Sequence, residues 1–134
     1  MTTIVLDNEA VQALTNPAHP KRTHVLAHVD AVATDRRRGL RKSMVVPATV
    51  RVEAGWDRSD PRSAVANRLT INNHLLDQAS ANQAAQIVRR TGLTPADAHV
   101  AVVALTAPDD VVVLTSDTPD ITRATDGQVR IVRV

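Results

Sequence analysis

Short runs of Val, Ile and Leu alternate with segments patterned as helices along most of the chain. The apolar runs cover residues 3–6, 44–46, 111–114 and 129–132. Strands that alternate with helices predict a parallel sheet with right-handed crossovers, because a parallel strand pair needs a long connection. With one Trp and no Phe or Tyr, the core must consist of Val, Leu, Ile and Ala. This composition favours strands covered by helices on both faces, so we expect an α/β fold with a central parallel sheet.

Helices are expected at residues 10–14, 22–38, 49–56, 62–69, 77–90 and 94–106, and a short one should begin at 117–120. Gly39 and Gly92 are each expected to follow the C-terminus of a helix, because the residue at that position often adopts a positive φ, which glycine tolerates. Thr94 is a suitable N-cap, followed by Pro at the first helical position and by Asp97 three residues after the cap. Residues 70–74 fit either a helix or a strand. The weakest element assignment therefore lies in the middle of the chain.

Length and composition predict one domain spanning residues 1–134, with 43% hydrophobic residues available for a core. The chain has no Cys, which excludes disulfides and thiolate metal sites. No apolar run approaches the roughly 18 residues of a membrane span. The amino terminus reaches Asp7 without a basic stretch or an apolar signal core. We therefore expect a cytoplasmic protein that is not inserted in a membrane.

Four acids lie beside the ends of apolar segments or near helix starts: Asp7, Glu53, Asp97 and Asp117. In a parallel α/β fold, the carboxyl ends of the strands and the starts of the following helices meet at one edge of the sheet. Carboxylates brought together there repel one another and favour a hard divalent cation such as Mg²⁺. Such a cation can activate water and stabilise charge on a phosphate, so the pattern predicts metal-dependent phosphodiester chemistry.

Most of these acids also have a structural interpretation. Asp7 is a good N-cap, Asp97 occupies the acid position of a capping box, and Asp117 suits a turn. Asp120 is either an accessory acid of the site or a charge in the first turn of a helix. These alternatives stay open at the level of sequence, because a carboxylate has enough lone pairs to fill both roles.

Glu53 is the acid with the weakest structural explanation. It lies inside an expected helix beside Ala54 and three residues after Val50, so it should border the face turned toward the core. The positions three and four residues away carry no positive charge, which excludes a local salt bridge. An acid near the core requires a partner from elsewhere, and a cation is the partner we expect.

The segments around these acids resemble PIN-domain proteins, and most closely the VapC-type toxin ribonucleases of bacterial toxin–antitoxin pairs. The matching motifs, in order, are Leu6-Asp7, Val46-Pro47-Ala48 leading to Glu53, Ala96-Asp97-Ala98-His99 and Leu114-Thr115-Ser116-Asp117. The resemblance extends through the closing run at 129–134. It implies a three-layer α/β/α sandwich.

The resemblance further implies an endoribonuclease that depends on Mg²⁺ or Mn²⁺. The metal-site acids map onto Asp7, Glu53, Asp97 and Asp117, with Thr115 as a nearby hydroxyl. The implied partners are an RNA substrate, an antitoxin protein and a second copy in a homodimer. The alternative is a catalytically inactive or regulatory PIN domain that binds nucleic acid.

One departure from the family pattern lies at the start of the chain. The family often has a small hydroxyl residue or Gly two positions after the first Asp, whereas this chain has Glu9 there. Glu9 either adds an acid at the mouth of the site or points away from it. His99, two residues after Asp97, is predicted to pack or to fill a polar site rather than to act as a general base. Trp56 is predicted to pack in the core or at a dimer interface.

Overall fold

The computed structural model describes all 134 residues, Met1–Val134. The strands are β1 (Thr2–Leu6), β2 (Lys42–Pro47), β3 (Ile71–His74), β4 (Asp110–Thr115) and β5 (Arg130–Arg133). The α-helices are α1 (Asn8–Thr15), α2 (Arg22–Arg37), α3 (Ala48–Ala54), α4 (Ala64–Arg68), α5 (Gln78–Thr91), α6 (Pro95–Thr106) and α7 (Thr118–Ala124). A single 3₁₀ turn, Pro61–Ser63, precedes α4. The alternation of strands and helices predicted from the sequence is confirmed.

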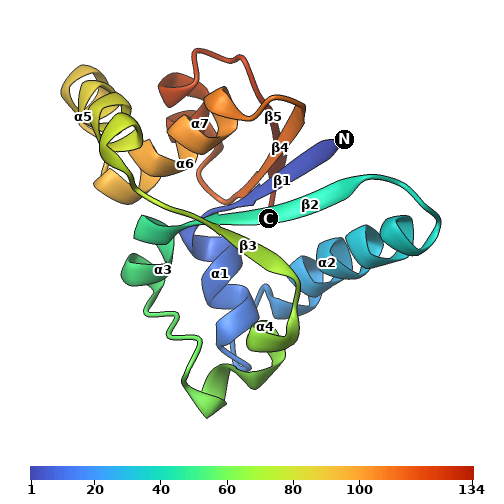
Figure 1. The fold of residues 1–134 in the computed structure, drawn as a ribbon. Helices are drawn as coiled ribbons and strands as arrows, with labels where there is room; N and C mark the ends of the chain where they lie inside the picture. Colours follow the sequence, from blue (N-terminus) through green and yellow to red (C-terminus); the bar gives the residue numbers. More distant parts are fainter.

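The five strands form one parallel sheet in the order β3-β2-β1-β4-β5. The chain moves outward from β1 to β3, and then returns past β1 to β4 and β5. Because each crossover is right-handed, reversing the direction of travel moves the connecting helices to the other face. Helices α1 to α4 accordingly lie on one face of the sheet and α5 to α7 on the other (Figure 1). The three-layer α/β/α architecture is confirmed.

The core consists of aliphatic side chains, as the composition predicts. Strands β1 and β4 lie side by side at the centre of the sheet, where Val5 and Val113 pair in register and are both 0% exposed. Helix α6 is buried on nearly every side, since it lies between the sheet and α5. A second, smaller apolar cluster joins α5, α6 and α7. Burial of α6 fixes its first turn, and with it Asp97, relative to the carboxyl ends of β1 and β4.

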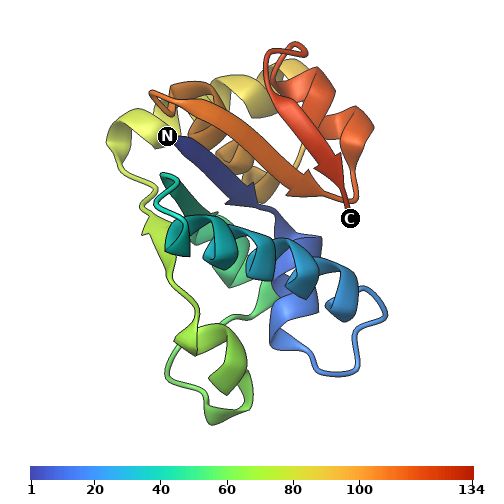
Figure 2. The same cartoon turned by 90° about the vertical axis from the view of Figure 1, so that its right-hand side faces the viewer.

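Several element boundaries differ from the sequence expectation. Residues 70–74, ambiguous in sequence, contain the edge strand β3, which pairs with β2 (Figure 2). The helix expected at 62–69 is divided into the 3₁₀ turn and the five-residue α4. Pro61 fixes φ at the start of this segment and favours a turn entered from Asp60. Gly39 follows α2 with φ 82°, as its expected role in ending that helix requires.

No helix of the structure combines the length and the apolar character needed to cross a membrane.

Candidate metal centre

Asp7 lies immediately after β1, at the carboxyl edge of the sheet. Only 5% of it is exposed, and its Oδ1 accepts a hydrogen bond from the backbone N–H of Ala10 at 3.0 Å. The N-cap role considered from the sequence is therefore confirmed. This bond uses one lone pair of the carboxylate and leaves capacity for further partners.

The charge state of Asp7 is strongly affected by its surroundings. Burial raises the pKa of Asp7 to about 6, because the ionised form loses its hydration. Hydrogen bonds from the Thr115 hydroxyl and the Ala10 amide lower this pKa, whereas the nearby charges of Asp97 and Glu9 raise it. Asp7 is thus an acid whose ionised form is poorly compensated within the protein.

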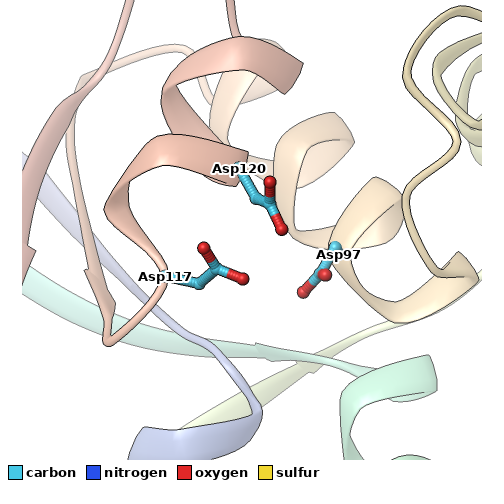
Figure 3. A group of neighbouring side chains, drawn as sticks. All are labelled: Asp97, Asp117 and Asp120. Atoms are coloured by element: carbon cyan, nitrogen blue, oxygen red, sulfur yellow. The ribbon is translucent and has the colours of Figure 1, made fainter.

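Three other acids converge beside this position. Asp97 lies in the first turn of α6, Asp117 is the residue that precedes α7, and Asp120 lies in the first turn of α7. Each offers a carboxylate oxygen, and these oxygens lie within 4.8 Å of one another. Figure 3 shows the three side chains directed toward a common space between the two helix starts. We call Asp97, Asp117 and Asp120 the aspartate triad.

Local structure holds the triad in place. The Thr94 hydroxyl accepts a hydrogen bond from the backbone N–H of Asp97 at 3.2 Å, as expected for the N-cap of α6. The hydroxyl of Thr115, which is 0% exposed, accepts from the backbone N–H of Asp117 at 2.9 Å. The Thr115 hydroxyl therefore contacts both parts of the site, the backbone of Asp117 and the carboxyl group of Asp7.

Electrostatic repulsion within the triad is only partly relieved. Burial, followed by the charges of Glu53 and Asp120, raises the pKa of Asp97. Burial and the neighbouring carboxyl of Asp120 raise the pKa of Asp117. At 4.8 Å, two unit negative charges repel by about 1 kcal/mol in water and about 3 kcal/mol at an effective dielectric of about 20. The one ion pair of the triad joins Arg123 to Asp120 at 3.3 Å.

The donor set fits a hard divalent cation. Carboxylate oxygens are the protein ligands that Mg²⁺ and Mn²⁺ accept, and Mg²⁺ typically uses few of them while retaining several waters. Burial and repulsion both raise these pKa values, and a bound cation would offset the two effects by stabilising the ionised carboxylates. The triad therefore has the ligand chemistry of a Mg²⁺ or Mn²⁺ site.

The structure contradicts the expected environment of Glu53. Its side chain is exposed rather than turned toward the core, and it makes no salt bridge. Val50 is the one buried residue of the seven-residue α3, so the apolar face of this helix is narrow. A solvated carboxylate needs no buried partner, and the argument for a cation from the burial of Glu53 is wrong. The charge of Glu53 nevertheless raises the pKa of Asp97, so it lies near the triad.

The structure places Asp120 in the first turn of α7 and also among the gathered acids, and it directs Glu9 elsewhere. Asp120 belongs to the triad, whereas Asp7 and Glu53 lie outside that group of oxygens. The signal for Asp120 in the sequence was its position three residues after Asp117, which places both on one side of a helix start. Glu9 contacts His19 at 3.2 Å and Lys21 at 3.5 Å in the loop after α1. Its carboxylate is thereby engaged outside the triad.

His99 and Trp56 occupy the packed positions predicted for them. His99 is 0% exposed, and burial followed by the nearby His74 lowers its pKa to about 4. Trp56 is 3% exposed, and its Nε1 donates to Oδ1 of Asn67 at 2.9 Å. Both rings are thus part of the protein interior.

Comparison with known proteins identifies the fold. No protein-family model matches the chain, and no curated protein matches its sequence. Among solved structures, the chain is similar to one chain of the crystal structure of VapBC2 from Rickettsia felis bound to a DNA fragment from their promoter. The TM-score is 0.63 at 10% identity, and the match covers 99% of this chain and 98% of the other. The chain therefore has, over nearly its whole length, the PIN-like fold that the sequence resemblance implies.

Proposed function

We propose that the chain is a metal-dependent endoribonuclease, built as a single PIN-like domain, that acts as the toxin of a toxin–antitoxin pair. The observation that carries the proposal is the convergence of the aspartate triad, with its oxygens within 4.8 Å, at the carboxyl edge of the sheet. Gathered together, these carboxylates favour a bound cation. Without a cation they would repel a negatively charged phosphate. The full-length similarity to a chain of a VapBC2 structure supports the same proposal.

In this proposal Asp97, Asp117 and Asp120 hold Mg²⁺, or Mn²⁺ in its place. Asp7 and Glu53, outside the triad, would add negative charge that strengthens binding of the cation. Thr115 keeps the backbone of Asp117 and the side chain of Asp7 in their relative positions. The bound cation supplies activation of water and stabilisation of the charge that grows on the phosphate during cleavage.

The decisive experiment is cleavage of a structured RNA by the purified protein with Mg²⁺, with Mn²⁺ and with excess EDTA. Cleavage that EDTA abolishes and added Mg²⁺ restores is the expected result. RNA binding without cleavage under all three conditions would instead support the regulatory nucleic-acid-binding alternative. Cleavage that persists in EDTA would overturn the metal mechanism.

Asp120→Asn is expected to weaken Mg²⁺ and Mn²⁺ binding by about tenfold, since it removes one charged oxygen ligand worth roughly 1.4 kcal/mol or more. Isothermal titration calorimetry measures the change. Asp109→Asn is the matched control, because it removes the same charge from an exposed position beside the opposite end of β4. Equal affinities of the two variants would remove Asp120 from the site.

The proposed partners follow from the same function. An antitoxin encoded beside a toxin would restrain it, and a homodimer would use apolar surface that one copy leaves exposed. Val52 is 82% exposed and Leu75 is 72% exposed, so each has apolar area to bury. Growth arrest on expression, relieved by coexpression of the adjacent reading frame, tests the antitoxin. Sedimentation of the chain and of its Val52→Asp variant tests the dimer.

A further inference from the structure

Basic side chains gather at the turn that leads from α2 into β2. Residues 35–42 contain five basic residues and one acid. Arg37, Arg38 and Arg41 are exposed, and Arg36 is partly exposed. We call these four residues the arginine turn. The small net charge of the chain, +2, therefore includes one concentrated region of positive surface.

Two contacts hold the arginine turn in a defined shape. Asp35 forms an ion pair with the ammonium group of Lys42, and Nε of Arg36 donates to the backbone carbonyl of Lys42 at 2.8 Å. Both contacts join the last turn of α2 to the first residue of β2. Inside the turn, the backbone N–H of Leu40 donates to the carbonyl of Asp35 at 3.0 Å. The backbone is therefore ordered before any ligand binds, which lowers the entropy cost of binding.

The charges of the arginine turn have no counter-charge within the chain. None of the four residues forms an ion pair. Arg36 donates to a carbonyl and Arg37 donates to the hydroxyl of Thr34, and neither acceptor carries a charge. These two are the side-chain hydrogen bonds of the arginine turn, so Arg38 and Arg41 keep all of their donors for a ligand.

The acids of α2 do not neutralise the arginine turn. Asp35 is already paired with Lys42. Asp30 lies seven residues before Arg37, which corresponds to about 10 Å along the helix. This distance exceeds the screening length of about 8 Å at physiological salt, so the charge of Asp30 acts only weakly on the turn.

The acids at the start of β4 lie near the same edge of the sheet. Asp110 forms an ion pair with Arg130 at 3.4 Å. Thr2 pairs with Lys42 on one side and with Asp110 on the other, so two strand spacings, about 10 Å, separate Lys42 from Asp110. Asp109, the neighbouring acid, has no ion pair but starts from the same remote strand. The positive surface of the turn is thus distinct from the charges of β4.

Helix capping accounts for only part of the positive charge. Arg36 and Arg37 lie in the last turn of α2, where a cation interacts well with the helix dipole. Arg38 is the C-cap residue, and Arg41 lies beyond the helix, next to the start of β2. The negative end of a helix dipole is equivalent to about half an elementary charge, which four cations greatly exceed.

The chemistry of the arginine turn suits a phosphate backbone. The planar guanidinium group of Arg donates two parallel hydrogen bonds to a phosphate. Protein interfaces, by contrast, are built around aromatic and apolar anchors and carry few charges at their centre. Residues 35–42 contain no aromatic residue, and Leu40 is their one large apolar side chain. The turn therefore favours a nucleic acid over a protein partner.

The arginine turn lies at the opposite edge of the sheet from the aspartate triad. The end of α2 lies beside the amino terminus of the chain, and the N–H of Thr2 donates to the carbonyl of Arg41 at 2.9 Å (Figure 2). Asp7 follows five residues after Thr2, about 17 Å away along β1. The carboxyl edge is acidic and attracts a cation, whereas attraction for the RNA backbone comes from the amino edge.

We propose that the arginine turn binds phosphates of the substrate RNA at a distance from the cleaved bond and so provides a second point of attachment. This inference rests on the ribonuclease function proposed above. It assigns the basic amino edge of the sheet to the RNA backbone and the acidic carboxyl edge to the cation.

The salt dependence of RNA binding tests this proposal. A fluorescently labelled single-stranded RNA of about 16 nucleotides is titrated with the full chain in EDTA, at about 50 to 200 mM KCl. Each phosphate contact contributes roughly 0.7 to the slope of log affinity against log salt concentration. The triple variant Arg37→Gln, Arg38→Gln, Arg41→Gln should reduce this slope by about 2 and weaken binding by about tenfold or more. Arg36 stays in place, because its bond to the Lys42 carbonyl holds the turn.

Two controls separate charge at this position from other effects. The triple variant Arg37→Lys, Arg38→Lys, Arg41→Lys keeps the three charges and should keep the slope. Arg68→Gln removes one exposed charge without an ion pair from α4 and should leave the slope unchanged, whereas Arg38→Gln alone should reduce it by about 0.7. Circular dichroism and Mg²⁺ affinity should be the same in all of these proteins.

RNA length provides a second readout. A strand stacked as in a duplex rises about 3.4 Å per nucleotide, so about 4 nucleotides do not extend over about 17 Å. The triple Gln variant should therefore raise KM for the RNA of about 16 nucleotides, with little change in kcat. For an RNA of about 4 nucleotides, both KM and kcat should match those of the unmodified chain.

The outcomes separate the two proposals. An unchanged salt slope in the triple Gln variant, while the unmodified chain cleaves RNA, overturns the role of the arginine turn alone. An equal loss of RNA affinity in the triple Lys variant assigns these residues a structural role and also overturns it. Unchanged RNA affinity with weakened binding of the coexpressed antitoxin would assign the turn to a protein partner instead. A chain that neither binds nor cleaves RNA overturns both proposals.

Discussion

Asp97→Asn is expected to reduce metal-dependent RNA cleavage by about 10³-fold, because stabilisation of transition-state charge by a cation is worth several kcal/mol and each 1.36 kcal/mol is a factor of ten. Asp97 is the acid whose charge couples to most of the others: its pKa responds to Glu53 and Asp120, and its charge affects Asp7 and Asp117. Loss of its charge therefore weakens the whole site. The measurement is the cleavage rate at saturating Mg²⁺, compared between the variant and the unmodified chain.

The fold should survive this substitution. Asn has nearly the same shape as Asp, and the hydrogen bond from the backbone N–H of residue 97 to Thr94 does not involve the side chain that changes. Circular dichroism should therefore be unchanged and the melting temperature no lower. The Asp109→Asn control should cleave RNA normally. Undiminished cleavage by Asp97→Asn would show that the triad is not the catalytic metal site.

Asp7→Asn is expected to stabilise the metal-free protein by up to about 3 kcal/mol at pH 7, since a pKa raised from 3.8 to about 6 corresponds to that cost of ionising the folded state. The folded state binds the proton more tightly than the unfolded state does. The contribution of Asp7 to stability is therefore greatest below pH 3.8, declines as the pH rises to about 6, and stays low above it. Asn remains a good N-cap for α1, so the substitution removes the charge and keeps the capping bond.

Urea denaturation between pH 4 and pH 8 measures this effect. The unmodified chain in EDTA should lose stability across the window from pH 4 to pH 6, and Asp7→Asn should flatten that dependence. Saturating Mg²⁺ should restore stability to the unmodified chain, because a ligand bound only by the folded state stabilises it. A destabilised Asp7→Asn protein at pH 7 in EDTA would contradict the uncompensated charge assigned to Asp7.

Local sequence signals were most reliable where one physical requirement dominated. Val111 to Leu114 had to be buried in any fold, and they lie in the interior strand β4. The signals at Thr94, Pro95 and Asp97 each correspond to a helix N-terminus, and α6 begins there. Such signals act within one turn or one strand, so they do not depend on what packs against the segment.

The exposure of Glu53 and the membership of Asp120 depended on packing between elements. Helix α3 is seven residues long and buries little more than Val50, so its sequence does not define which side meets the protein. The sequence left Asp120 open between an accessory acid and a first-turn charge, and the packing of α6 against α7 brings its carboxylate within 4.8 Å of those of Asp97 and Asp117. The edge strand β3 likewise exists because β2 offers it hydrogen bonds, since INNH alone has little strand character.

The sequence by itself determined a parallel α/β fold and the gathering of acids at its carboxyl edge, because strand burial and helix capping are encoded by neighbouring residues. The tertiary structure alone decided which acids share a space, which way Glu53 faces, and that His99 connects Thr49 to His74. The contacts of Asp97 with the acids of α7, and of His99 with Thr49 and His74, join residues 20 to 50 positions apart in the sequence. Their distances depend on how helices pack across the sheet edge, and local sequence carries no measure of that packing.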